Sequence, residues 1–183
     1  QVPPAPAEVE AEGLKLDYNV VRSSWQLVAA TMKIPRLYLA IISISFFWAI
    51  GAILAAQFPP LVKNALGGDN TVATMFTAVC SVGVSIGSIV VNRLLKGEVS
   101  AKYSPISVMI MSLFVLDLWW NVYSWTQSGS ELMNWRQFLD ITAGDRIIID
   151  LLGVAIAGGM FVVPLYAFLT TTVPKSETAR TVA

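Results

Sequence analysis

The sequence predicts an all-α integral membrane protein with four transmembrane helices. Hydrophobic residues make up 55% of the 183 residues and charged residues only 13%, whereas soluble domains contain about 25% charged residues. Four long stretches carry little or no formal charge, and a hydrocarbon core about 30 Å thick needs about 20 apolar residues per helix. The charged residues gather in the segments between these stretches, as they do in membrane proteins.

Composition argues against several classes of function. Lys and Arg number 12, as do Asp and Glu, so the net charge is zero and no basic surface is available for nucleic acid. The sequence has no His, and its one Cys, Cys80, lies within an apolar stretch; this excludes a His-dependent triad and an intramolecular disulfide, and argues against a zinc site. No nucleophile and base occur at a recognisable spacing. We therefore expect neither an enzyme nor a cofactor in this chain.

The segments at the two ends are predicted to lie outside the membrane core. Residues 1–18 are rich in Pro, Ala and Glu, a composition typical of a flexible cytoplasmic linker. Residues 19–36 predict an amphipathic helix, which would either lie on the inner membrane surface or pack on neighbouring helices. Residues 173–183 are expected to form a further cytoplasmic segment. The sequence starts with Gln1 instead of an initiator methionine, and its first residues do not have the pattern of a leader peptide. We therefore expect a piece of a larger protein.

The transmembrane domain is predicted to cover residues 37–172. Its spans are expected at about 37–61, 71–95, 104–125 and 146–171. The Gly67-Gly68 pair predicts the turn that closes the first outer loop. The charged segment 92–102 forms the inner turn between the second and third spans, and residues 131–139 predict a short surface helix in the outer connection.

Small residues predict where the spans pack closely. Gly83 and Gly87, with nearby serines, give the second span a face that favours helix packing over ligand binding. In the fourth span, Gly158, Gly159 and Pro164 predict a bend or a locally unwound segment. Because irregular backbone at membrane depth is tolerated where it is buried or lines a cavity, we expect the fourth span to form a cavity wall.

The distribution of cations predicts the orientation of the spans. Nine Lys and Arg residues fall on one side of them, and three on the other, namely Lys63, Arg136 and Arg146. Cytoplasmic loops carry the excess of Lys and Arg, so both ends of the chain should be cytoplasmic. The aromatic residues at 119–125 then lie at the outer interface, where their rings favour the headgroup level.

A few polar residues within the spans are candidates for chemistry. Asp117 has Asn121 four residues later on the same helical face; it serves either proton coupling and substrate handling, or helix packing through a partner such as Arg146. Arg146 and Asp150 are also four apart and could pair at the outer mouth of the fourth span. Further candidates are Trp48 and Gln57 in the first span, whose polar tips either satisfy a neighbouring helix or line a solvated cavity.

Several segments together resemble a known transporter family. They are Phe46-Phe47-Trp48-Ala49-Ile50-Gly51-Ala52, Gln57-Phe58-Pro59-Pro60, Leu66-Gly67-Gly68-Asp69, the stretch from Gly83 to Ser88, Asp117-Leu118, Asp150-Leu151, and Gly158-Gly159 followed by Val163-Pro164-Leu165-Tyr166-Ala167. In this order they are similar to the major-facilitator family of bacterial lysophospholipid transporters. The similarity is greatest to the transporter part of proteins in which that domain is fused to an acyltransferase and an acyl-carrier-protein synthetase, and it extends from about residue 25 to residue 183.

The resemblance implies a place for the chain within a larger transporter. The four spans would be helices seven to ten of twelve, in the C-terminal half of a major facilitator superfamily protein, and residues 1–35 would link its two halves. The first half and two helices of the second would then be missing partners. The first and fourth spans would face the central cavity, the second would move against the other half, and the third would be peripheral.

These observations lead to one leading hypothesis about function and two alternatives. The leading hypothesis is a transporter of the bacterial inner membrane that moves lysophospholipid toward the cytoplasmic leaflet by alternating access. Its predicted substrate-binding residues are Phe47, Trp48, Gly51, Gln57, Gly158, Gly159 and Tyr166, because an amphipathic substrate suits apolar walls with few polar anchors. The alternatives are a proton-coupled exporter of a small apolar compound, and a non-transporting membrane anchor that presents lipid to an attached acyltransferase.

Overall fold

The computed structural model describes residues 25, 29, 34–96, 98, 100–126 and 131–172. The predicted linker at 1–18, the predicted C-terminal segment at 173–183 and most of the predicted amphipathic helix at 19–36 lie outside the described residues. Within that helix, Trp25 and Ala29 are helical, and Trp25 is 75% exposed.

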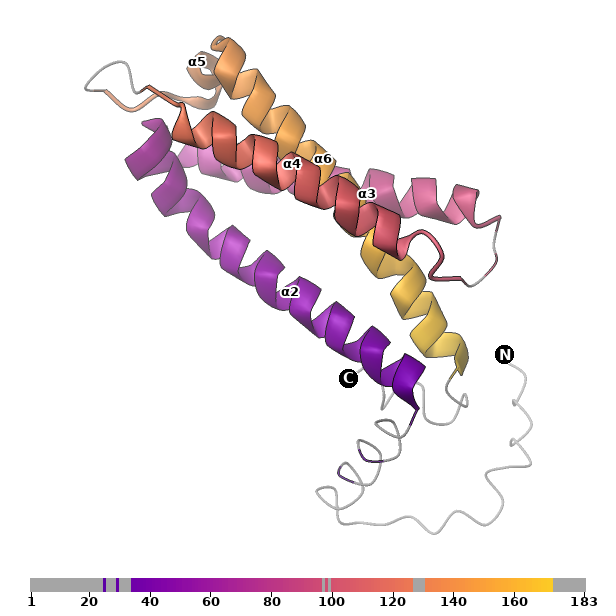
Figure 1. The fold of residues 1–183 in the computed structure, drawn as a ribbon. Coiled ribbons are helices and arrows are strands. Elements are labelled where there is room, and N and C mark those ends of the chain that lie inside the picture. Colours follow the sequence, from indigo (N-terminus) through magenta and orange to yellow (C-terminus); the bar gives the residue numbers. More distant parts are fainter. Residues whose placement is uncertain are drawn as a thin grey trace, which may run out of the picture.

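The described part of the chain is helical and contains no strand (Figure 1). Its elements, in order, are α2 (Pro35–Leu61), the π-helix η2 (Val62–Leu66), α3 (Asn70–Leu94), α4 (Ser104–Tyr123), α5 (Trp135–Leu139) and α6 (Thr142–Thr172). Four of these, α2 with η2, α3, α4 and α6, are long and apolar enough to cross a membrane. The prediction of four helices long and apolar enough to span a membrane is therefore confirmed, and each lies within a few residues of its expected bounds.

The first outer turn forms as the sequence predicts. η2 ends at Gly67, whose φ of 67° places it in the left-handed region that glycine occupies without a steric penalty. The side chain of Asp69 then caps α3 by accepting a hydrogen bond from the amide of Thr71 at 2.8 Å. Hydrogen bonds from the Thr71 hydroxyl and amide lower the pKa of the Asp69 carboxyl, which stabilises the charged form of the cap.

The fourth span is one continuous helix, so of the two forms predicted for it, bent or locally unwound, the unwound one is wrong. α6 is helical from Thr142 to Thr172, without an unwound segment at Gly158, Gly159 or Pro164. All three of these residues are buried. In hydrocarbon, a non-helical backbone would leave further amide and carbonyl groups without partners, so a helix accepts one proline more readily than it unwinds. Gly158 and Gly159 serve helix packing, because they lie against Phe47 of α2 and the backbone of α3.

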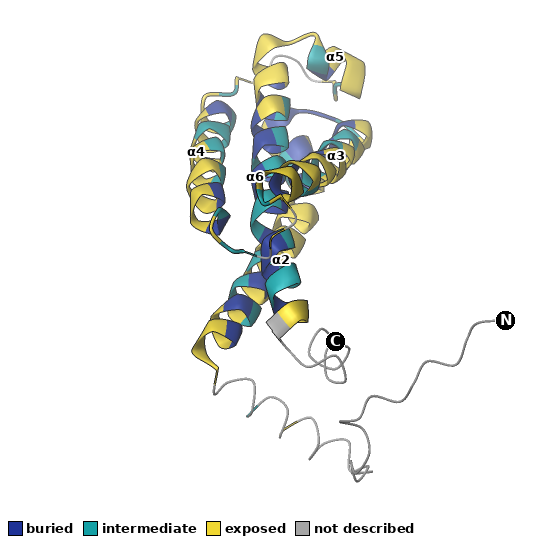
Figure 2. Ribbon diagram, turned by 90° about the vertical axis from the view of Figure 1, so that its right-hand side faces the viewer, coloured by how far each residue is buried: buried dark blue, intermediate teal, exposed yellow. Residues whose placement is uncertain are grey.

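α6 is the central helix of the bundle. In its most apolar window 56% of the residues are buried, against 22% in α3 and 11% in each of α2 and α4. Figure 2 shows buried and intermediate residues along α6 and mostly exposed residues on the helices around it. α3 and α4 make the largest contacts with α6, and α2 makes a smaller one.

Glycines allow the backbones of α3 and α6 to meet. A Cβ atom at Gly87 would lie 2.1 Å from the carbonyl oxygen of Ile156, and one at Gly83 would lie 2.5 Å from the Cβ of Ala155. From the other side, a Cβ at Gly159 would lie 2.5 Å from the carbonyl oxygen of Val84. The predicted small-residue packing face of the second span is therefore confirmed, and its partner is the fourth span.

A buried cluster joins the ends of the helices on the side predicted to be the outer one, and we call it the outer cluster. Its residues are Phe58, Val62, Leu66, Val72, Ala73, Phe76, Phe138, Ile147 and Leu151. Phe138 of α5 is fully buried, with its ring stacked on Trp125 at 5.4 Å between centroids and edge-on to Phe76 at 5.7 Å. Backbone hydrogen bonds also tie the two outer connections together, from the amide of Asp69 to the carbonyl of Met133 and from the amide of Met133 to the carbonyl of Gly67, each 2.8 Å long. The surface helix predicted at 131–139 is shorter than expected, because only Trp135–Leu139 are helical. It also buries Phe138 in this cluster.

The middle of α2 stands apart from the other described helices. Residues 49–57 are helical and every one of them is exposed. A Cβ at Gly51 would meet no other atom within 4 Å. α2 is instead held at its ends, by Leu37, Ala40 and Ile44 beside α6 and by Phe58 within the outer cluster.

Candidate functional site

Four of the seven predicted substrate-binding residues meet where α2 faces α6. The indole nitrogen Nε1 of Trp48 donates a hydrogen bond of 2.9 Å to the hydroxyl of Tyr166. The ring of Phe47 lies 5.7 Å from that of Phe161 and packs against Gly158, where a Cβ would lie 3.1 Å from the Phe47 ring. The first and fourth spans therefore share an aromatic contact with one polar link.

The other three predicted residues are not part of this contact. Gly51 and Gln57 lie on the exposed stretch of α2, and Gly159 faces the backbone of α3. The reason is that α2 and α6 diverge beyond Trp48, so residues one to three turns further along α2 lose contact with α6. The seven residues do not line a single cavity in this structure.

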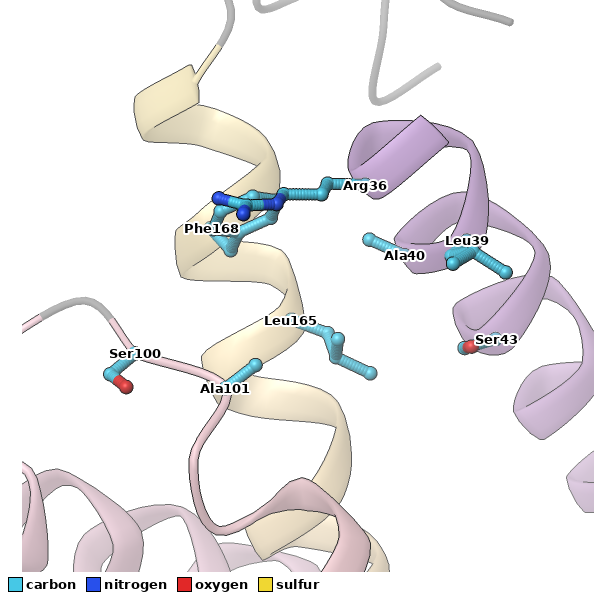
Figure 3. Close-up of a pocket in the computed structure, with 8 residues that line it drawn as sticks. All are labelled: Arg36, Leu39, Ala40, Ser43, Ser100, Ala101, Leu165 and Phe168. Atoms are coloured by element: carbon cyan, nitrogen blue, oxygen red, sulfur yellow. The ribbon is translucent and has the colours of Figure 1, made fainter. Parts of the chain in front are cut away.

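A groove next to the aromatic contact was not predicted from the sequence. It has a volume of about 400 Å³ and lies between α2, α6 and the loop that joins α3 to α4, which is predicted to be the inner loop (Figure 3). Its lining residues are Arg36, Leu39, Ala40, Ser43, Ser100, Ala101, Leu165 and Phe168. In the sequence, the one signal for this groove was the cation Arg36 at the start of the first span. Ser100 and Ala101 gave no signal, because the fold of the loop brings them to the groove.

The polar residues of the third and fourth spans pair between helices. The guanidinium of Arg146 on α6 donates to the carboxylate of Asp117 on α4, with Nη2 to Oδ1 at 2.8 Å and Nε to Oδ2 at 3.2 Å. One turn deeper, the amide of Asn121 donates to Oδ2 of Asp150 at 2.6 Å. The pair of Asp117 with Arg146 is the one that the sequence suggested for a packing role, whereas the pair of Asn121 with Asp150 was not predicted.

The two pairs differ in their exposure to the surroundings. The side chains of Arg146 and Asp117 are 58% and 38% exposed, whereas Asn121 and Asp150 are 7% and 2% exposed as residues. Exposed ion pairs contribute about 0–1 kcal/mol, and a buried polar group left without its partner costs about 1–3 kcal/mol. The buried amide and carboxyl pair is therefore the stronger determinant of how α4 packs on α6, which favours the packing role among the two predicted for this cluster.

The four polar residues lie apart from the aromatic contact and the groove. They join α4 to α6 in the outer part of the bundle, whereas Trp48, Tyr166 and the groove involve α2 and the C-terminal half of α6. The candidate functional site is consequently the region between α2 and α6. Comparison of the chain with family models, with curated proteins and with solved structures found no match.

Proposed function

We propose that this chain is part of a bacterial inner-membrane transporter that moves lysophospholipid toward the cytoplasmic leaflet by alternating access. The observation that supports this most is the contact between Trp48 and Tyr166, with Phe47 beside it. Large apolar rings with a few polar tips suit a molecule that has one acyl chain and one polar headgroup. The contact joins two spans through side chains rather than backbones, so it can open while the helices stay intact.

The packing of the helices supports a larger assembly around them. α3 and α4 pack on α6, but residues 49–57 of α2 are exposed on all sides. A helix that is apolar around its whole circumference is normally surrounded by protein or lipid. We propose that these helices belong to the C-terminal half of a major-facilitator transporter, in which the remaining helices cover part of α2 and complete the cavity.

The aromatic contact leads to a prediction about transport. Trp48→Ala in the full-length protein should reduce uptake of labelled lysophospholipid about tenfold, the factor that corresponds to about 1.4 kcal/mol. The measurement is the initial rate of uptake into cells or proteoliposomes at matched protein levels. Trp120→Ala is the control, because Trp120 lies on α4 and is 57% exposed, close to the 54% of Trp48. Uptake equal in Trp48→Ala, the control and the wild type would remove Trp48 from the site.

The proposed orientation can be tested with two matched cysteine variants. Glu98 in the inner loop and Glu131 in the outer connection are both exposed. In a Cys80→Ser background, a thiol reagent that does not cross membranes should label Glu131→Cys in intact cells and Glu98→Cys only after permeabilisation, because the loop with more cations stays in the cytoplasm. The reverse pattern would place both ends outside and contradict the proposal.

A further inference from the structure

The groove at the inner end of α2 has an arrangement suited to an amphiphile with a negative charge. On α2, Arg36, Leu39, Ala40 and Ser43 recur at intervals of three and four residues, so they share one face of the helix. Arg36 lies at the start of the helix and Ser43 about 10 Å further along it, at 1.5 Å per residue. Across the groove, Leu165 and Phe168 of α6 complete an apolar wall.

The polar groups that line the groove are all able to donate hydrogen bonds. The Arg36 side chain extends from α2 toward α6 in Figure 3, and the guanidinium has no ion-pair partner among the described residues. Ser43 makes no hydrogen bond there either, whereas most hydroxyls on α3 and α4 donate to the carbonyl four residues earlier. Ser100 accepts a hydrogen bond from the amide of Lys102, so its own O–H can still donate. No acidic side chain is among the lining residues.

A guanidinium beside an apolar wall matches an amphiphile with an anionic headgroup. Guanidinium groups bind phosphate through paired, charge-assisted hydrogen bonds. The apolar residues offer no partner to a free anion, but they can contact a hydrocarbon chain. A volume of about 400 Å³ lies within the range of small-molecule sites.

We propose that this groove binds the phosphate headgroup of a single-chain lipid, with Arg36 on the phosphate and the acyl chain along Leu165 and Phe168. The proposal rests on the proposed function and specifies it, because it makes the phosphate the part of the lysophospholipid that the protein recognises. The groove adjoins the aromatic contact, since Ala40 and Leu165 of its wall lie in one hydrophobic cluster with Phe47 and Tyr166. By the predicted orientation this is the cytoplasmic end, where the lipid would be delivered.

Binding measurements on the full-length protein in neutral phosphatidylcholine nanodiscs test the proposal. The probes are lysophosphatidate, monoacylglycerol with the same acyl chain, and inorganic phosphate. The wild type should bind lysophosphatidate more tightly than either of the other two. Arg36→Gln should weaken lysophosphatidate binding about tenfold or more, because a charge-assisted contact is lost, and should leave monoacylglycerol binding unchanged. The monoacylglycerol measurement also reports that the variant is folded.

The chain provides a matched control for the charge of Arg36. Lys102→Gln removes the same charge from an exposed residue of the inner loop that does not line the groove, and should have little effect.

Three results would overturn the proposal. One is an equal loss of lysophosphatidate affinity in Arg36→Gln and Lys102→Gln, which would indicate an effect of general surface charge. Another is an equal loss of affinity for lysophosphatidate and monoacylglycerol in Arg36→Gln. The third is that the wild type binds inorganic phosphate as tightly as lysophosphatidate. Transport is a separate measurement: wild-type protein that binds as described but does not transport would contradict the proposed function and leave the groove assigned.

Discussion

Phe138→Ala is expected to lower the free energy of unfolding by about 3–5 kcal/mol, the usual cost of truncating a fully buried aromatic side chain. Phe138 is fully buried, and its ring lies between Trp125 and Phe76. Truncation would remove both ring contacts and open a cavity that spans three parts of the chain. Unfolding in mixed micelles, followed by tryptophan fluorescence, measures the change, because Trp125 stacks directly on the truncated ring.

Trp135 on the same short helix provides the control for this experiment. It is a larger aromatic residue, but it is 42% exposed and its ring is in contact with the Arg136 guanidinium at 5.1 Å. Trp135→Ala should cost no more than about 1 kcal/mol, the value of an exposed cation–π contact. Similar losses for Phe138→Ala and Trp135→Ala would contradict the role of Phe138 as the centre of the outer cluster.

Gly87→Leu should destabilise the packing of α3 on α6 by about 3 kcal/mol. Even the first atom of a side chain at this position would lie 2.1 Å from the carbonyl oxygen of Ile156, far closer than atoms can approach. The obstacle is backbone, which cannot rotate away as a side chain can, so the two helices would have to separate. The same unfolding measurement in mixed micelles detects the loss.

Gly51→Leu is the matched control for Gly87→Leu, because both replace a glycine in a spanning helix with the same side chain. A Cβ at Gly51 would meet no atom within 4 Å. Replacing glycine in a helix interior stabilises the helix by about 0.5–1 kcal/mol, so this variant should be unchanged or slightly more stable. A destabilised Gly51→Leu and an unaffected Gly87→Leu would together refute the observed helix contacts.

The positions of the helices were predictable from the sequence because the membrane imposes a simple rule. A stretch without charges that is long enough to cross hydrocarbon has no alternative to a helix, so the four spans could be placed from composition alone. The packing face at Gly83 and Gly87 was also predictable, since small residues on one face allow backbones to meet. The sequence did not reveal which helix would occupy that face, because a small-residue pattern on one helix does not specify its partner.

The details of the candidate site depended on contacts between helices. Spacing on one helix suggested Arg146 with Asp150, but the crossing of α4 and α6 brings Asp117 to Arg146 and Asn121 to Asp150. Trp48 and Tyr166 were both predicted as site residues, yet their hydrogen bond follows from how α2 leans on α6. The groove lined by Arg36 and Ser100 joins residues 64 positions apart, and no local pattern signals such a meeting.

The free middle of α2 makes this helix sensitive to the thickness of the bilayer. Its 27 residues extend about 40 Å, whereas the hydrocarbon core measures about 30 Å, and a helix longer than the core tilts to fit. Phe47 and Trp48 contact α6, and Phe58 lies in the outer cluster, but residues 49–57 between them are exposed. A change in membrane thickness should therefore be taken up by bending of α2 within residues 49–57, while the contacts on either side of this stretch are kept.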